Sequence, residues 1–403
     1  MTVDTMRTID FYVGVPLCFI ATIWLKIVKL FTPKSSAKPH RVLFLQLSEM
    51  GSAIIGDAAL RHARAKGLDI HYAIFKKNAA SLRLVGTVPD ERIYRIRDHN
   101  FLVLAYDSLR LLFWSRQNKI DSVIDFELFS RYSALLTAFS GARERVGFHK
   151  FHAEGLYRGE ILTRRVSYNT HIHIAKNFMA LVKSLLSSDL DLPFFKGEIR
   201  DDEIQPTKVT VTPEARARVL AELNKLGASP ATAGGSLKWV IFNCAGGEFL
   251  PQRRWPTMHF AKLAQIILER HPDTAVILTG SPDEFNEVDP IRVVASRNRC
   301  FNFAGRIRFE DLTALYSLSK LMVSNDSGPA HFASLTDLPT YVFFGPESPK
   351  LYGSLGQFTA LYADYACSPC VSAFNHRKTP CQDNKCLQVI TPESVYKIIQ
   401  PQL

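Results

Sequence analysis

The stretch from residue 321 to residue 346, LMVSNDSGPAHFASLTDLPTYVFFGP, constrains the fold of this chain more than any other. A short apolar run leads through a polar turn into a helix of small residues (329–335), and a second apolar run follows. This order predicts a strand, a loop, a helix and a second strand, with Ser327 capping the helix and Pro329 in its first turn. The start of such a helix offers unpaired backbone N–H groups and the positive end of the helix dipole. The stretch therefore predicts a seat for a phosphate group.

Two side chains of the same stretch can contribute to a binding site. Asp326 lies just before the predicted cap and His331 about one turn into the helix, so both can face the same edge of the sheet. Ala330 and Ala333 allow the helix to lie close to the sheet. The alternative is an ordinary connection between two strands, in which Asp326 and His331 have structural roles.

Length and charge limit the class of protein. A chain of 403 residues favours two domains, because single compact cores seldom grow that large. The net charge of +11 indicates an anionic partner: a membrane face, a phosphorylated lipid or sugar, a nucleotide, or nucleic acid. We expect no nucleic-acid partner, since the basic residues are not interleaved with aromatic residues in a repeated pattern.

The first 39 residues contain an almost unbroken apolar run, 11–25, which we interpret as a retained membrane anchor. No small-residue cleavage site follows the run, and the nearby lysines lie on its C-terminal side, which argues against a cleaved signal peptide. These lysines are Lys26, Lys29, Lys34 and Lys38. Their position predicts that the rest of the chain lies on the cytoplasmic side of the membrane. Gly14 and Pro16 would bend the helix near its start, so a re-entrant or interfacial helix is an alternative to a span. A plain helix packed on the protein is a further alternative, which would need a large groove to bury the run.

Residues 40–190 are predicted to form a first doubly wound α/β domain. A buried strand (41–47), a tight polar turn and a helix (53–66) open it, and further strands and helices alternate after them. Ligands of such domains bind at the carboxyl ends of the strands. Glu49, in the first turn, is therefore placed to take a proton from an attacking hydroxyl. Asp57 is its rival, and a solvated loop acid is the alternative reading of Glu49.

Beyond residue 141 the chain becomes basic, and we expect an irregular, loop-rich region there. So many cations suit an anionic, phosphorylated acceptor. The residues that we assign to the acceptor site are Arg143, Arg145, His149 and Lys150. The alternative is a solvated cationic face, which is what most charge runs are.

Residues 205–390 are predicted to form a second α/β domain, after a charged, proline-flanked connection. A strand (239–243) is followed by small residues, which would let a ligand approach the backbone closely, and then by two arginines suited to a diphosphate. The candidate ligand-binding residues of this segment are Asn243, Gly246, Gly247, Arg253 and Arg254.

The segment SNDSGPAHFA at 324–333, with FGP at 344–346, resembles the signature of glycosyltransferase family 9, the heptosyltransferases of lipopolysaccharide core assembly. The resemblance covers nearly all of residues 41–400 and includes the turn LSEMGS. It implies an α/β fold of the GT-B type, in which two Rossmann-like doubly wound domains face a central cleft, here after an N-terminal membrane-anchoring helix. It also implies that a final helix, 391–403, crosses back to the first domain.

The resemblance further implies a reaction, which is the inverting transfer of a sugar from a nucleotide-diphosphate donor without an obligatory metal or other cofactor. Arg253 or Arg254 would stand where the family commonly has a phosphate-binding lysine, and residues 243–247 would line the nucleotide site. The donor's diphosphate and sugar would be held by Asp326, Ser327, Gly328 and His331.

One position departs from the family pattern. The usual first turn has Gly followed by Asp, the proposed general base, whereas this chain has Gly51 followed by Ser52. A serine cannot act as a base at neutral pH without help. We therefore expect Glu49, on the same turn, to take the role, with Ser52 beside it; the alternative is an impaired enzyme.

Four of the seven cysteines fall close together, at Cys367, Cys370, Cys381 and Cys386. Their number and the nearby His376 suit a structural zinc site, although the spacing is irregular. Disulfides and plain loop cysteines are the alternatives.

These observations together predict a glycosyltransferase that moves heptose or a related sugar to a lipid-linked saccharide, such as lipopolysaccharide core, at the cytoplasmic membrane face. An alternative enzyme uses the same fold with another nucleotide sugar for a different surface glycan. An alternative from another class is a catalytically weakened scaffold subunit that keeps the donor pocket, which the serine at position 52 would favour.

Overall fold

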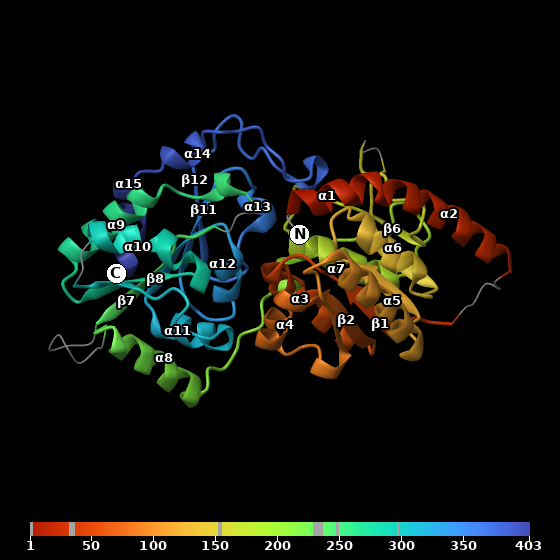
Figure 1. The fold of residues 1–403 in the computed structure, drawn as a ribbon, viewed down its shortest axis with the longest axis horizontal. Coiled ribbons are helices and arrows are strands. Elements are labelled where there is room, and N and C mark those ends of the chain that lie inside the picture. Colours follow the sequence, from red (N-terminus) through yellow and green to blue (C-terminus); the bar gives the residue numbers. More distant parts are fainter. Residues whose placement is uncertain (1–2, 32–36, 152–154, 229–236, 247–249, 296–297) are drawn as a thin grey trace. The chain divides into compact units, whose positions relative to one another are not determined.

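The computed structural model describes residues 3–31, 37–151, 155–228, 237–246, 250–295 and 298–403. The chain divides into two compact units, Met1–Gln205 (unit 1) and Pro206–Leu403 (unit 2). Each unit has a six-stranded, wholly parallel sheet covered by helices, as Figure 1 shows. The prediction of two Rossmann-like α/β domains is confirmed. The predicted cleft between them stays a prediction.

The sheet of unit 1 has the strand order β3-β2-β1-β4-β5-β6. The order reverses at β1, because the chain leaves β1 for β2 on one side and returns to β4 on the other. The first three strands run outward from this point and the last three run outward the other way, which is the doubly wound pattern. The strands are β1 (Arg41–Leu45), β2 (Asp69–Phe75), β3 (Ile93–Ile96), β4 (Ser122–Asp125), β5 (Glu144–His149) and β6 (Arg164–Ser167).

Helices cover both faces of this sheet. On one face α3 packs against α4 and α7, and on the other α5 and α6 pack over a core that includes Leu45, Phe75 and Val123. Side chains cap the starts of α5 and α6, since Asn100 accepts from the amide of Val103 and Ser130 from that of Ser133. The helices are α3 (Met50–Ala65), α4 (Ala80–Val85), α5 (Phe101–Gln117), α6 (Arg131–Phe139) and α7 (Ile174–Leu186).

Two N-terminal helices, α1 (Val3–Tyr12) and α2 (Gly14–Phe31), belong to unit 1 and pack on α6. They lie along the outside of the unit, next to α6, in Figure 1. The helix breaks at Val13, beside the glycine and proline that were expected to bend it. By length and composition α2 could cross a membrane. One face of α2 packs on the protein, as the packed-helix alternative predicted. Most apolar side chains of α2 lie outside this face and are exposed.

The sheet of unit 2 has the strand order β12-β11-β10-β7-β8-β9. All of its strands except the edge strand β12 are nearly continuous buried runs, as expected of parallel strands covered on both faces. The strands are β7 (Lys238–Asn243), β8 (Thr274–Thr279), β9 (Cys300–Asn302), β10 (Leu321–Asn325), β11 (Thr340–Phe344) and β12 (Phe358–Tyr362).

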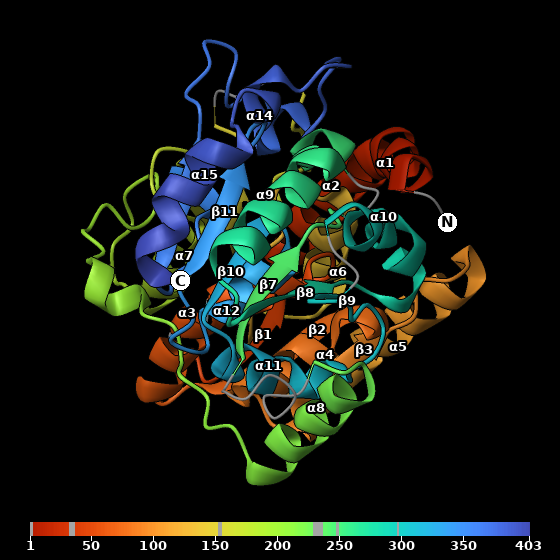
Figure 2. The same ribbon diagram turned by 90° about the vertical axis from the view of Figure 1, so that its left-hand side faces the viewer.

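The main core of unit 2 lies between its sheet and α9, α10 and α15, as Figure 2 shows from the side of this unit. The helices of unit 2 are α8 (Pro213–Lys225), α9 (Thr257–Arg270), α10 (Phe285–Ala295), α11 (Leu312–Leu318), α12 (Gly328–Ala333), α13 (Pro349–Tyr352), α14 (Lys385–Gln388) and α15 (Pro392–Ile399). The final helix α15 packs on α9, where the Tyr396 hydroxyl lies 3.0 Å from His271 Nε2. A return of this helix to the first domain stays a prediction.

Candidate functional site

The candidate donor site of unit 2 forms at the carboxyl ends of β7 and β10. These strands are neighbours, with Asn243 opposite Ser324 in the register. The Asn243 side-chain amide donates to the hydroxyls of Ser324 (3.2 Å) and Ser327 (2.8 Å). The segments at 243 and 324–327, far apart in the sequence, are therefore joined at one edge of the sheet.

The start of the following helix, α12, differs from the prediction. Ser327 stands at the cap position, but its hydroxyl donates to the Asn325 carbonyl (3.2 Å), and no side-chain cap bond to the helix forms. The hydroxyl is already occupied by the bond from Asn243. The helix α12 is also shorter than predicted, since it spans only Gly328–Ala333. Gly328 opens the helix, and His331 lies on it, 9 % exposed.

Asn325 ties β10 to the chain that follows β7. Its side-chain oxygen accepts from the Trp255 amide (2.9 Å), and its side-chain nitrogen donates to the Cys244 carbonyl (2.6 Å). Trp255 is almost fully buried and stacks on Phe343, with ring centroids 4.2 Å apart. The arginines just before Trp255 are therefore held by a packed side chain and a buried hydrogen bond.

The two arginines have different partners. Arg253 lies 3.5 Å from the Asp326 carboxylate, and both side chains are mostly buried. Arg254 pairs with Glu287 at 2.9 Å. The Arg254 side chain also fills the space that a Cβ at Gly246 would occupy, because that atom would lie 2.7 Å from the Arg254 Cγ. Arg253 therefore lies closer to the signature residues than Arg254 does. The remaining candidate of this segment, Gly247, lies outside the described residues.

In unit 1 the first turn brings Glu49 and Ser52 together. The helix α3 begins at Met50, earlier than predicted, so Ser52 lies in its first turn and Glu49 precedes it. The Ser52 hydroxyl donates to the Glu49 carboxylate at 2.9 Å. This bond fixes the orientation of the carboxylate, which is the group that we assign as the general base. The rival Asp57 is buried and accepts from Arg61 and Thr87, so it is committed to structural bonds.

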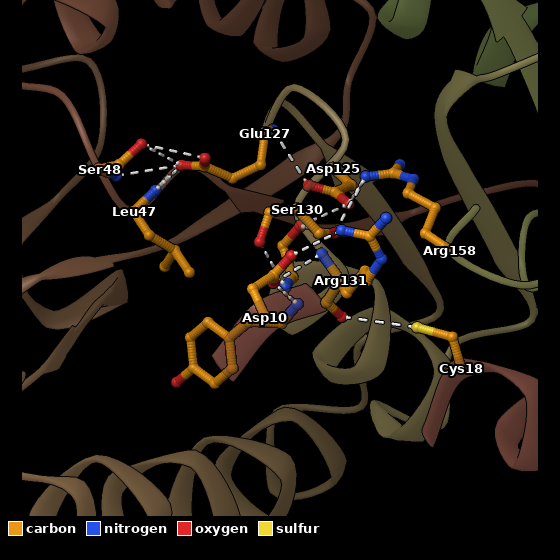
Figure 3. Close-up of polar contacts among 11 residues, drawn as sticks. Asp10, Cys18, Leu47, Ser48, Asp125, Glu127, Ser130, Arg131 and Arg158 are labelled. Carbon is orange, nitrogen blue, oxygen red and sulfur yellow. Dashed lines mark hydrogen bonds and ion pairs between the residues drawn. The ribbon is translucent and has the colours of Figure 1, made fainter. Parts of the chain in front are cut away.

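A second carboxylate, Glu127, holds the same turn from β4, as Figure 3 shows. Its oxygens accept from the backbone amides of Leu47 (2.6 Å) and Ser48 (3.0 Å) and from the Ser48 hydroxyl (3.0 Å). The pKa of Glu127 is raised to about 7. Desolvation is the largest cause, the charge of Asp125 adds to it, and the hydrogen bonds from Leu47 and Ser48 partly offset it. Glu127 thus fixes the residues just before Glu49, and its charge changes near neutral pH.

Asp125 ends β4 next to this turn and is fully buried. It accepts from the Glu127 amide (3.0 Å) and the Ser133 hydroxyl (2.9 Å), and it pairs with Arg158 at 3.1 Å. Burial raises the pKa of Asp125, and the Arg158 guanidinium opposes this shift. Arg158 comes from the basic segment beyond residue 141, so at least this cation is a structural partner and not a free ligand for an acceptor.

The four residues assigned to the acceptor site are not brought together. Arg143 precedes β5 and His149 ends it, so the two residues lie at opposite ends of one strand. At 3.3 Å per residue their separation along the strand is about 20 Å. Arg145 donates to the carbonyls of Ile161 (2.8 Å) and Ala142 (2.8 Å). Of the four, His149 and Lys150 lie at the carboxyl end of the strand, where ligands of such sheets bind.

The expectation of a loop-rich basic region is confirmed, since residues 150–151, 155–163 and 168–173 form neither helix nor strand. The segment also contains β5, β6 and the start of α7, and several of its cations pair with acids, some inside the segment and some from other parts of the chain. These pairs are Arg158–Asp125, Arg164–Glu144, Arg165–Glu160 and Lys176–Asp201.

The cysteine cluster holds free thiols at Cys367, Cys370, Cys381 and Cys386. Burial raises the pKa of the Cys386 thiol, and the other three thiols add to the effect. Among the described residues, no group of three or more His, Cys, Asp or Glu side chains is arranged to hold a metal ion.

One protein-family model matches the part of the chain that contains most of these residues. The family model described as glycosyltransferase family 9 (heptosyltransferase) matches residues 115–379, which include β4, the basic segment and the whole site of unit 2. The chain belongs to this family. The match begins after the first turn, so Glu49 and Ser52 lie outside it.

Curated relatives of this family-9 glycosyltransferase are named for heptosyl transfer. The lipooligosaccharide heptosyltransferase 2 of Haemophilus influenzae is 30% identical over 43% of this chain and 46% of its own length. The lipopolysaccharide heptosyltransferase 2 of Escherichia coli is 32% identical over 27% of this chain and 32% of its own length. The chain thus matches less than half the length of these relatives.

Solved structures agree on the fold. The E. coli ADP-heptose heptosyltransferase II aligns with a TM-score of 0.64 at 18% identity, covering 90% of this chain and 98% of that one. The E. coli heptosyltransferase WaaC with ADP aligns with a TM-score of 0.62 at 17% identity, covering 90% of this chain and all of that one. At these identities the likeness shows the GT-B type of fold and no more.

Two carboxylates of unit 1, Asp125 and Glu127, were not among the residues predicted from the sequence. Their signal is present in the run SVIDFE, where acids follow directly on a buried strand. Carboxyl ends of neighbouring parallel strands meet at one edge of a sheet, so these acids belong beside the first turn.

Proposed function

We propose that this chain transfers heptose or a related sugar, with inversion and without a metal, from a nucleotide-diphosphate donor to a lipid-linked saccharide such as lipopolysaccharide core. Membership of family 9 and the heptosyltransferase names of the relatives support this reaction. The proposed location is the cytoplasmic face of the inner membrane, where a lipid-linked acceptor of this kind would be accessible.

The observation that carries the proposal is the joined site of unit 2. Asn243, Ser327, Asp326 and Arg253 meet at the carboxyl ends of two neighbouring strands, where doubly wound sheets bind nucleotides. We assign Arg253 to the donor's diphosphate, because a guanidinium can bind two phosphate oxygens at once. Asp326 holds that guanidinium in place until the donor arrives, and it can then accept from a sugar hydroxyl.

The proton acceptor in this proposal is Glu49. The acceptor sugar's hydroxyl would lose its proton to the Glu49 carboxylate as its oxygen attacks the anomeric carbon and the nucleoside diphosphate leaves. The Ser52 hydroxyl orients the carboxylate through their 2.9 Å bond. Glu127 fixes the turn that carries it.

A donor panel tests the donor half of the proposal. ADP-heptose, UDP-sugars and GDP-sugars are added to the full chain and thermal unfolding is followed, since a ligand at 100 times its Kd stabilises the folded state by about 2.7 kcal/mol. We expect one donor class to raise the melting temperature, and Asp326→Asn to abolish this rise. The control is Asp337→Asn, because that side chain is 83 % exposed and pairs with Lys208 at the surface.

Turnover with the bound donor tests the catalytic half. We expect Glu49→Gln to reduce turnover by two orders of magnitude or more while the donor-induced thermal shift is kept, as on the order of 10²-fold or more is typical for loss of a general base. Unchanged turnover would remove Glu49 from the mechanism. Tight donor binding by the wild type without turnover would favour the scaffold alternative.

A further inference from the structure

The outer face of α2 carries much exposed apolar surface. On α2 the side chains of Leu17, Ile20, Trp24, Ile27 and Leu30 are all exposed and follow one another at intervals of three or four residues. Such spacing places them on one side of the helix. A contiguous apolar strip of this length on a protein surface marks an interaction site.

The opposite face of α2 is bonded to unit 1. Cys18 and Ala21 pack against Ala134, Ala138 and Ile161 in one small core. The Thr22 hydroxyl accepts from the Glu160 amide at 2.9 Å. Close approach is built in, since a Cβ at Gly159 would lie 2.7 Å from the Cys18 carbonyl oxygen.

The helix before it, α1, is attached to unit 1 by an ion pair between the half-buried Asp10 and the buried Arg131, which Figure 3 shows. Asp10 accepts from the Arg131 and Tyr132 amides, both at 2.9 Å, and lies 3.1 Å from the Arg131 guanidinium. Asp10 thereby caps the start of α6. Arg131 is 2 % exposed and donates further to the carbonyls of Tyr157 and Gly155.

This attachment argues against a spanning helix. If α2 spanned the membrane with these contacts kept, the polar backbone of residues 159–160 and the Asp10–Arg131 pair would enter the hydrocarbon core with it. If they stayed outside, the contacts would have to break. Polar backbone and charges do not enter the hydrocarbon core without partners. A helix with one face on protein and the other apolar fits a position along the membrane surface instead.

A second apolar strip lies on the neighbouring helix α5. Leu102, Tyr106, Leu109 and Phe113 are exposed at intervals of three or four residues, on the side opposite the buried Leu111. Both α2 and α5 contact α6, and Tyr132 on α6 bonds to Asp10 on one side and to Ser108 of α5 on the other. In Figure 1 α5, α6 and α2 lie along the same side of unit 1.

The charges of these helices fit an anionic surface. The exposed charged residues of α2 and α5 are Lys26, Lys29, Arg110 and Arg116. The acid within α5, Asp107, is buried and bonded to Arg97, and α2 contains no acid. Basic residues beside an apolar strip bind the head groups of anionic lipids while the apolar side chains enter the bilayer.

We propose that unit 1 is a monotopic membrane domain, in which α2 lies in the plane of an anionic lipid leaflet with its outer face inserted and the α5 strip inserts beside it. This inference goes beyond the proposed reaction, because it holds whichever sugar is transferred. Its occupant is the bilayer itself and not a partner protein or a second copy of the chain.

Vesicle flotation of the full chain tests the contact. We expect the wild type to float with phosphatidylcholine vesicles that contain 30% phosphatidylglycerol, and Ile27→Glu to reduce the bound fraction at least tenfold. The matched control is Ile398→Glu in unit 2, since Ile27 and Ile398 are both 46 % exposed. Equal binding of both variants would overturn the proposal for α2.

The α5 strip is tested separately with Leu109→Glu, for which we expect a loss of three- to tenfold. Unchanged binding of this variant would remove α5 from the membrane contact. Turnover on a detergent-dispersed acceptor is measured alongside, and we expect both variants to keep it. Loss of vesicle binding with turnover intact separates this inference from the proposed reaction, whose failure would abolish turnover in the wild type as well.

Labelling in cells distinguishes an interfacial helix from a span. In Thr5→Cys a spanning α2 would place the new thiol outside the cytoplasm, where a membrane-impermeant maleimide reaches it in intact spheroplasts. We expect no modification of this thiol until the cells are lysed, as read by peptide mass spectrometry. Modification in intact spheroplasts would overturn the interfacial position.

Discussion

The titration of Glu127 gives the sharpest test of the first-turn geometry. Its side chain is half-buried beside the ends of β1 and β4, and its pKa is raised from the ordinary 4.5 to about 7, chiefly by desolvation. The folded chain therefore holds a proton between pH 4.5 and 7 that the unfolded chain has already released. The stability of the fold must fall as pH rises through this window, because the folded state then binds more protons than the unfolded state.

The size of the effect follows from the two pKa values. Each pKa unit corresponds to 1.36 kcal/mol, so the ionisation of Glu127 lowers the free energy of unfolding by about 3 kcal/mol between pH 4.5 and pH 8.5. Glu127→Gln cannot ionise, yet its side-chain oxygen can still accept from the Leu47 and Ser48 amides. The variant should thus escape the decline without losing the turn.

Urea denaturation at pH 5 and at pH 8.5 measures this effect. We expect the free energy of unfolding of Glu127→Gln, relative to wild type, to rise by about 3 kcal/mol from the lower to the higher pH. The control is Glu91→Gln, because Glu91 is exposed and should give the same difference at both pH values. A Glu127→Gln curve that runs parallel to wild type would refute the burial argument.

Three further outcomes are expected. Asp10→Asn leaves the buried Arg131 without its counter-charge and should destabilise the full chain by about 3–5 kcal/mol in urea denaturation; a cost below 1 kcal/mol would contradict the latch. Trp255→Ala removes a side chain that is 1 % exposed and should cost about 3–5 kcal/mol, measured in the same way. Lys150→Ala should raise the acceptor KM about tenfold, the size of one charge-assisted hydrogen bond, whereas Arg143→Ala should not, because it lies at the other edge of the sheet; equal effects would refute this placement.

The sequence predicted the strand, turn and helix at 321–346 because apolar runs and a polar turn are local signals. It did not predict the bonding of Ser327, since the competing donor, Asn243, comes from a strand 84 residues earlier. Hydrogen bonds of this kind depend on strand order, which local patterns do not encode. The pairing of Arg158, a cation of the basic segment, was missed for the same cause, because its partner Asp125 comes from another strand, β4.

The N-terminal helix shows a different limit of sequence reasoning. Its apolar run was evident, but the choice between span and surface depends on which face finds a partner. That choice rests on the small side chains of α6 and on the Asp10–Arg131 pair, which join positions more than 100 residues apart. Periodicity within 11–31 could not reveal it, since α2 is apolar nearly all round.

The latch between Asp10 and the start of α6 has a mechanical consequence. The short segment from the end of β4 to the start of α6 carries Glu127, which holds the first turn, and ends at Arg131, which holds Asp10. This one segment therefore links the proposed membrane contact to the first-turn carboxylates. With α2 lying in the leaflet as proposed, the height of Glu49 above the lipid surface is set by side-chain packing and not by a flexible tether. Unit 1 would then accept only those lipid-linked saccharides whose free hydroxyl lies at the same distance from the bilayer as Glu49.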